Sequence, residues 1–91
     1  GIVLDALDRS GAAARTTIVF WSDHGYSLGE RGQWMKQTLF EQATRVPLLI
    51  AGAGVKARGK ASPRTVEFLD LYPTLAQLAN LKAPARLHGA S

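Results

Sequence analysis

The stretch from Thr16 to Lys36 constrains the fold most, because an apolar run stops abruptly there at a group of polar residues. Residues 17–21 are β-branched or aromatic and give apolar character to both faces of a strand. They predict a buried strand over about 17–22. In open parallel sheets, ligands bind beyond the carboxyl ends of the strands. The Ser-Asp-His-Gly sequence at 22–25 holds that position, so we expect the chemistry to lie there.

A second run of the same character predicts another strand at about 46–51, where Pro47 is tolerated only near the start. Between the two strands lie a loop and a short helical stretch around 37–44. A strand, a crossover and a further strand make a βαβ unit, whose strands are parallel. The fold class predicted is therefore α/β, with a partial, mostly parallel sheet and flanking helices.

Two helices are expected outside this unit. Residues 1–10 carry a short apolar stripe that predicts the end of a helix, and Gly11 is suited to stop it. Leucines recur on one face over about 71–81 and predict a second helix. Asp70 is the expected N-cap of that helix, and Pro73 is tolerated because it falls in the first turn.

The remaining segments are loops. Residues 53–63 are rich in glycine and basic residues and predict an exposed basic loop, and residues 82–91 predict a connector. With 91 residues and no cysteine, the chain can form one small domain at most, and an open α/β layer of this size buries little apolar surface. We therefore expect it to be a piece of a larger domain.

The composition of the chain argues against several classes of protein and of binding site. A hydrophobic fraction of 46% with 20% charged residues is typical of a globular protein and not of a disordered one. The net charge of +4 is compatible with an anionic ligand but does not indicate nucleic acid, and no apolar run is long enough to span a membrane. The absence of cysteine excludes thiolate metal sites. The compartment stays open, and no signal peptide is recognised in the chain.

The candidate site residues follow the first strand. Asp23 and His24 offer a carboxylate and an imidazole, which suit a divalent cation or acid/base chemistry. The alternative is that Asp23 caps the next turn and His24 packs against it. The glycine-rich site loop at 23–36 would let Lys36 fold back toward both residues and neutralise a bound oxyanion, unless Lys36 is simply a solvated side chain.

Another class of function is suggested by the basic loop. Gly54-Val55-Lys56-Ala57-Arg58-Gly59-Lys60 fits the pattern G-x-x-x-x-G-K of phosphate-binding loops. Ala61 has no hydroxyl for magnesium, however, and Ser62-Pro63 does not open the helix that such a loop requires. The alternatives are an exposed basic loop and a surface that attracts a polyanion such as a sulfated glycan.

The residues from 22 to 52, SDHGYSLGERGQWMKQTLFEQATRVPLLIAG, resemble the sulfatase family of the alkaline phosphatase superfamily, most closely its iduronate-2-sulfatase-like and choline-sulfatase-like members. Residues 70–74 are similar to the D-L-x-P-T helix start of that family, and residues 87–89 to its L-x-G-x-S ending. The resemblance implies that 1–91 is a partial sulfatase catalytic domain, a fragment of the alkaline-phosphatase-like sandwich. The parent family is often periplasmic, secreted or lysosomal.

Carried over to this sequence, the resemblance implies that Asp23 and His24 are ligands of a divalent cation, calcium or in some members manganese. It implies that Lys36 is catalytic and contacts the oxyanion of an anionic sulfate-ester substrate. A phosphonate or phosphodiester is the alternative substrate within the superfamily. Arg31 receives no catalytic role, and Arg45 is expected to pair with a carboxylate.

The family's nucleophile is a formylglycine made from cysteine or serine in a C/S-x-P/A-x-R motif. The chain has no cysteine, and Ser62-Pro63-Arg64 does not fit because its proline follows the serine directly. We therefore expect a fragment of a metal-dependent sulfuric ester hydrolase that is inactive alone. The alternative is a non-catalytic remnant.

Overall fold

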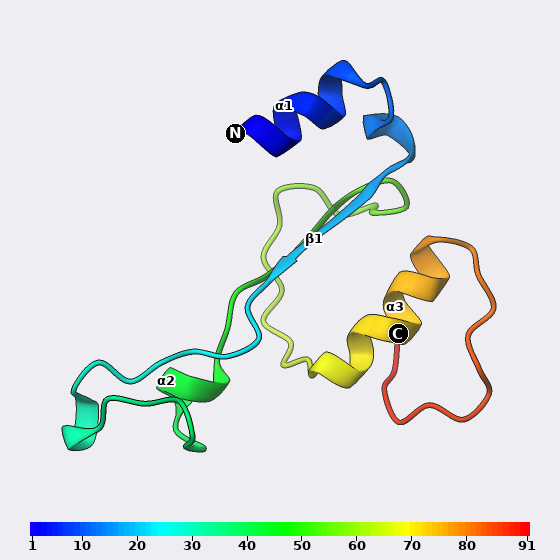
Figure 1. Cartoon of the computed structure of the whole chain (residues 1–91). Helices are drawn as coiled ribbons and strands as arrows, with labels where there is room; N and C mark the ends of the chain where they lie inside the picture. Colours follow the sequence, from blue (N-terminus) through cyan, green and yellow to red (C-terminus); the bar gives the residue numbers. More distant parts are fainter. The chain divides into compact units, whose positions relative to one another are not determined.

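The computed structural model describes all residues from 1 to 91, which form two compact units. One unit comprises residues 1–17 with 51–91, and the other comprises residues 18–50. Figure 1 shows the elements, which in chain order are α1 (Ile2–Arg9), η1 (Ala13–Arg15), β1 (Thr17–Trp21), η2 (Glu30–Gly32), α2 (Glu41–Thr44), β2 (Leu48–Gly52), η3 (Phe68–Asp70) and α3 (Leu71–Leu78). Here η denotes a 3-10 helix.

The strands β1 and β2 pair in a two-stranded sheet and lie side by side in Figure 1. At one end the amide of Ala53 donates to the carbonyl of Thr16 at 3.0 Å, and beyond the other end Gly25 donates to Ala43 at 2.8 Å. From Thr16 to Gly25 along one segment, the paired residue on the other segment falls from 53 to 43. The strands are therefore antiparallel. The predicted parallel βαβ arrangement is wrong for this pair.

The segment between the strands explains the correction. A parallel pair needs a crossover, usually a helix that carries the chain back along the sheet. Residues 22–47 contain only η2 and the single turn α2, which is shorter than the helical stretch predicted at 37–44. Gly29 and Gly32 instead turn the chain back, with φ angles of +112° and +68°. Apolar character on both faces of a strand predicts burial but carries no information on direction.

The helix α1 ends within the range predicted for the first helix. The Ser10 hydroxyl donates to the Leu7 carbonyl at 2.6 Å, and the Ser10 amide donates to Ala6 at 3.0 Å. Gly11 follows with a φ of +70°, a left-handed conformation that glycine adopts without steric cost. The helix is thus closed by one serine and one glycine.

The helix α3 is shorter than the predicted range of 71–81. Asn80 has a φ of +57°, and its amide donates to Gln77 at 3.0 Å. The amide of Leu81 donates to Ala76 at 2.8 Å. These two bonds form a Schellman ending, which satisfies the last carbonyls of a helix. Leu81 therefore lies beyond the helix and not on its apolar face.

Asp70 does not cap α3 as predicted. No side chain caps the start of α3, and Asp70 instead accepts the amide of Glu67 at 3.0 Å and the amide of Ala90 at 2.9 Å. These bonds lower the pKa of the Asp70 carboxyl, the Glu67 amide having the larger effect. The carboxylate thereby fastens the predicted connector at 82–91 to the beginning of α3.

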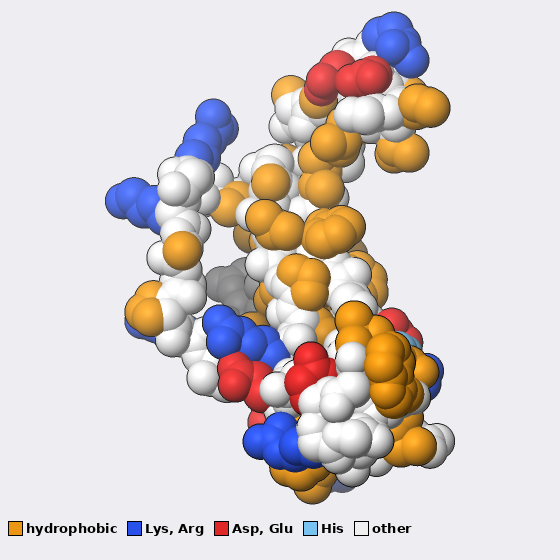
Figure 2. Space-filling model, turned by 90° about the vertical axis from the view of Figure 1, so that its left-hand side faces the viewer, with side chains coloured by type: hydrophobic (Ala, Val, Ile, Leu, Met, Phe, Trp, Pro, Cys, Tyr) orange, Lys and Arg blue, Asp and Glu red, His pale blue; other side chains and the backbone are white.

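Few side chains are buried. Ala43 and Ser27 are the only residues with almost no exposed surface. Large apolar side chains of both strands and of α1 stay at the surface, and Figure 2 shows hydrophobic side chains there; they include Ile2, Val3, Phe20, Trp21 and Leu49. Full burial of one such side chain is worth about 1.5–3 kcal/mol. Exposed apolar surface of this kind is suited to contact with further protein. The helices are all too short to cross a bilayer.

Candidate active site

The candidate site lies immediately after β1, in the unit of residues 18–50. The backbone leaves the strand through Ser22, whose hydroxyl donates to the carbonyl of His24 at 2.7 Å. The amide of Gly25 then donates to Ala43 in α2. These bonds fix the backbone on both sides of His24, so its imidazole leaves the chain in a defined direction.

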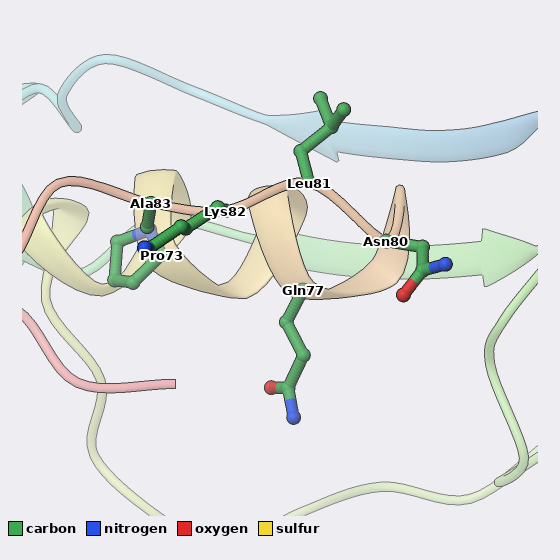
Figure 3. Close-up of a pocket in the computed structure, with 6 residues that line it drawn as sticks. All are labelled: Pro73, Gln77, Asn80, Leu81, Lys82 and Ala83. Carbon is green, nitrogen blue, oxygen red and sulfur yellow. The ribbon is translucent and has the colours of Figure 1, made fainter.

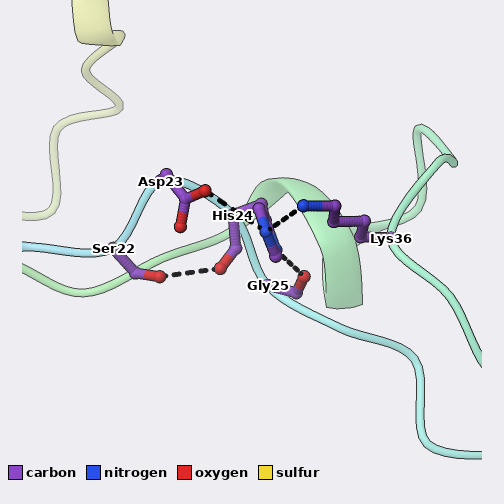
Figure 4. Close-up of polar contacts among 5 residues, drawn as sticks. All are labelled: Ser22, Asp23, His24, Gly25 and Lys36. Carbon is purple, nitrogen blue, oxygen red and sulfur yellow. Dashed lines mark hydrogen bonds and ion pairs between the residues drawn. The ribbon is translucent and has the colours of Figure 1, made fainter.

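Two side chains and one backbone carbonyl meet at the imidazole of His24 (Figure 4). The Lys36 ammonium nitrogen lies 2.7 Å from Nε2 of His24, and Oδ2 of Asp23 lies 3.2 Å from the same nitrogen. Nδ1 of His24 lies 2.7 Å from the carbonyl oxygen of Gly25. The structure therefore brings together all three site residues predicted from the sequence.

The contact with Lys36 selects one of the two tautomers of a neutral imidazole. An ammonium group has only donors, so Nε2 of His24 must accept from Lys36. Nδ1 must then carry the proton and donate it to the Gly25 carbonyl. In this neutral form, Nε2 of His24 and Oδ2 of Asp23 are both acceptors facing the same space. Two acceptors 3.2 Å apart are stable together when a cation lies beside them.

Asp23 does not cap a turn in the structure, so this alternative role is not observed. Its carboxylate oxygen lies 3.2 Å from Nε2 of His24, and no backbone amide donates to it. The Asp23 side chain is 80% exposed, whereas that of His24 is 33% exposed. No donor holds the exposed carboxylate, which is therefore free to turn toward a cation.

Two backbone hydrogen bonds across a turn bring Lys36 back beside His24. The amide of Ser27 donates to Met35 at 3.0 Å, and that of Gly29 donates to Gln33 at 2.9 Å. Ser27 is also one of the two buried residues. The sequence does not predict these backbone partners, although the spacing of Gly29 and Gly32 indicates a turn. The backbone turn positions Lys36 without help from its own side chain.

The donor set fits part of a divalent-cation site. A metal-binding histidine usually donates its other N–H to a carboxylate or carbonyl, as Nδ1 of His24 does to Gly25. Asp23 and His24 supply two donor atoms, and no group of three or more histidine and acidic residues lies together in this structure. Calcium takes six to eight oxygen ligands. The two residues can therefore hold such an ion only together with ligands from elsewhere.

Comparison with known proteins assigns the chain to a family. A family model described as Sulfatase matches residues 1–81. The chain belongs to the sulfatase family. Membership confirms the predicted α/β class, since the family has an alkaline-phosphatase-like α/β fold.

Curated sulfatases align with almost the whole chain. A protein named Sulfatase from Formosa agariphila is 51% identical over 94% of this chain and 17% of its own length. A choline-sulfatase of Rhizobium meliloti is 46% identical over 89% of the chain and 15% of its own length. The iduronate 2-sulfatase of Mus musculus is 39% identical over 94% of the chain and 20% of its own length. The chain thus spans a fifth or less of these sulfatases.

Two arginines of this sulfatase chain have local partners. The Arg31 guanidinium lies 4.1 Å from the centre of the Phe40 ring. Arg45 pairs with Glu41 at 2.7 Å, one turn earlier in α2. An exposed pair at this spacing contributes about 0.3–0.5 kcal/mol. Neither arginine contacts the imidazole of His24.

The basic loop does not have the architecture of a phosphate-binding loop. No helix begins directly after Lys60, and the next helical element is η3, at Phe68–Asp70. The helix N-terminus that would face a nucleotide phosphate is therefore missing. Gly54 has another reason to be glycine, because a Cβ atom there would lie 3.2 Å from the Leu78 side chain.

A hollow of about 390 Å³ lies at the end of α3 (Figure 3). Its lining residues are Pro73, Gln77, Asn80, Leu81, Lys82 and Ala83. Lys82 is the only charged side chain among them, and none is a nucleophile or a carboxylate. The hollow offers no group for ester hydrolysis.

Proposed function

We propose that this chain supplies one side of the active site of a divalent-cation-dependent sulfuric ester hydrolase. Asp23 and His24 serve as two ligands of the cation, and Lys36 faces the sulfate oxygens. The observation that carries the proposal is the convergence of carboxylate, neutral imidazole and ammonium at Nε2 of His24.

Each group has a defined task. The Asp23 oxygen and the neutral His24 nitrogen suit calcium or manganese as ligands. When bound, the cation withdraws charge from sulfate oxygens and helps to activate the nucleophile. Lys36 places a positive charge where negative charge develops as the ester bond breaks. Loss of one such stabilising group typically lowers kcat about 10²–10³-fold.

We propose further that the chain alone does not hydrolyse sulfate esters. It contains no cysteine, and no serine in the motif from which formylglycine is made. The missing ligands and nucleophile would come from protein outside these residues, in an alkaline-phosphatase-like sandwich. The exposed apolar side chains of β1 and β2 support this, because strands and helices of a complete domain would cover them.

The substrate class follows from charge. A sulfate ester is anionic, and we propose that the three cationic side chains of the basic loop, together with the arginine just after it, attract a polyanionic form of it, such as a sulfated glycan. These side chains are exposed and have no acidic partner; they are Lys56, Arg58, Lys60 and Arg64. An exposed cluster of one charge sign raises the local concentration of the opposite ion.

Calorimetry with calcium tests the metal site. We expect wild-type chain to bind calcium weakly, with a Kd of about 10⁻⁴–10⁻³ M, as open sites do. Asp23→Asn and His24→Gln should each abolish the heat of binding. Asp8→Asn and His88→Gln are matched controls, because they remove the same groups from positions outside the site. Equal binding by all five proteins would refute the proposed ligands.

A further inference from the structure

Arg31 has a backbone conformation that is unfavourable for a residue with a side chain. It lies between Gly29 and Gly32, and its φ of +55° and ψ of +26° are left-handed. The two glycines adopt such angles without steric cost, whereas an arginine does not. A residue kept in a strained conformation needs contacts that offset the strain. The contacts of the Arg31 side chain therefore indicate what this residue does.

The guanidinium of Arg31 rests on the start of α2. Its central carbon lies 4.1 Å from the centre of the Phe40 ring, and Nη1 donates to Oε1 of Gln42 at 3.4 Å. No acidic side chain pairs with it, and the neighbouring Glu30 carboxylate instead accepts the amide of Leu28 at 2.6 Å. A planar guanidinium stacks on a ring and donates in its own plane at the same time, which a lysine cannot do.

The same helical turn also supports the backbone beside His24. The amide of Gly25 donates to the carbonyl of Ala43 at 2.8 Å, and Gly25 passes too close to the carbonyl of Gln42 to carry a side chain. Ala43 is 4% exposed. The helix α2 thus contacts the chain directly after His24 and, through other atoms, the guanidinium of Arg31.

Lys36 follows a hairpin of residues 27–35. The bond from Ser27 to Met35 is internal to this hairpin, so it sets the shape of the hairpin but not its direction relative to α2. A single hydrogen bond joins the hairpin to α2, and Arg31 donates it. The contact of Arg31 with α2 therefore limits how far the hairpin, and Lys36 at its end, can swing away from His24.

We propose that Arg31 is a positioning residue, which ties the hairpin to α2 and thereby holds Lys36 beside His24. The inference rests on the proposed function, in which Lys36 faces the substrate; Arg31 itself touches no substrate. Because α2 also fixes the backbone at Gly25, one helical turn sets the places of both side chains. The 2.7 Å contact between Lys36 and His24 is then a consequence of the Arg31 contact as well as of the hairpin.

The test measures the nuclear Overhauser effect between the side-chain protons of Lys36 and the ring protons of His24. Arg31→Gly removes the guanidinium and suits the left-handed backbone, so it adds no strain. The effect should disappear in this variant, while the exchange protection of the Ser27 amide, which reports the hairpin, should change less than about threefold. Arg45→Gly removes the same charged group from the end of α2 and should leave the effect at its wild-type strength.

A second variant alters only the α2 side of the contact. Phe40→Leu combined with Gln42→Ala removes both partners of Arg31 and leaves the hairpin sequence intact, so it decides the test if Arg31→Gly opens the hairpin. It should also abolish the effect between Lys36 and His24. A wild-type effect in this double variant, or its loss in Arg45→Gly, would overturn the inference. The calcium titration of the wild-type chain does not depend on these outcomes, so the inference can fail while the proposed ligands stand.

Discussion

The carbonyl oxygen of Gly25 lies 2.7 Å from Nδ1 of His24 and is an acceptor for a proton on that nitrogen. The same residue passes so close to α2 that it has no room for a side chain. A Cβ atom at position 25 would overlap the carbonyl oxygen of Gln42. The glycine after His24 is therefore required by packing and at the same time orients the imidazole.

Gly25→Ala should accordingly destabilise the unit of residues 18–50. Relief of the overlap requires a backbone shift, and overpacking of this kind costs about 1–3 kcal/mol. Urea unfolding followed by the fluorescence of Trp21 and Trp34 measures this change. Gly1→Ala is the control, since no atom lies within 4 Å of its added carbon. Equal midpoints for the two variants would contradict the packing argument.

Acid should release the connector from α3. The amides of Glu67 and Ala90 lower the pKa of the Asp70 carboxyl, so the stabilisation is present above the unfolded value of about 3.9. It is lost as the pH falls through the lower folded value. Carbon-13 titration of Asp70 together with the Ala90 amide shift measures this. Asp70→Asn should remove the acid transition at Ala90; its persistence in the variant would assign it to another group.

The positions of the elements could be read from local patterns in the sequence, but their direction and exact ends could not. The run at 17–21 and the leucine spacing after Asp70 mark a strand and a helix through composition and periodicity, which act within a few residues. The antiparallel pairing of β1 with β2 depends on how the chain between them turns. The left-handed conformation of Asn80, which ends α3, cannot be recognised in the sequence, because asparagine occupies many conformations.

The candidate site, too, is only partly predictable from local patterns in the sequence. The abrupt change after Trp21 pointed to Asp23 and His24, and the glycines that follow indicated a turn that could return Lys36. The contact between Lys36 and Nε2 of His24 depends on the register of the bonds from Ser27 to Met35, which no spacing rule supplies. No third histidine or acidic side chain lies with Asp23 and His24 in the structure.

The basic loop should bind sulfated polyanions through charge. Replacement of Lys56 and Lys60 by glutamine should lower the salt concentration at which the chain leaves a heparin column, because fewer counterions are exchanged. Lys82→Gln combined with Arg9→Gln removes the same charge outside the loop and is the control. An equal shift in both double variants would show that net charge, and not the loop, governs retention.

The isolated chain should not turn over para-nitrophenyl sulfate in the presence of calcium or manganese. The reason is chemical: Lys36 and a cation can stabilise charge, but the chain encodes no formylglycine precursor to attack the sulfur. A full-length sulfatase carrying formylglycine serves as the positive control. Metal-dependent turnover by the chain that Lys36→Met abolishes would contradict this expectation.

The most direct measurement of the proposed site is manganese broadening of the two histidine rings. The sequence has two histidines, His24 in the candidate site and His88 in the connector, so each serves as a reference for the other. Because a paramagnetic ion broadens only nearby nuclei, substoichiometric manganese should remove the ring signals of His24 and spare those of His88. Asp23→Asn should abolish this selectivity. Broadening of His88 first, or of both rings equally in wild type, would contradict a metal site at Asp23 and His24.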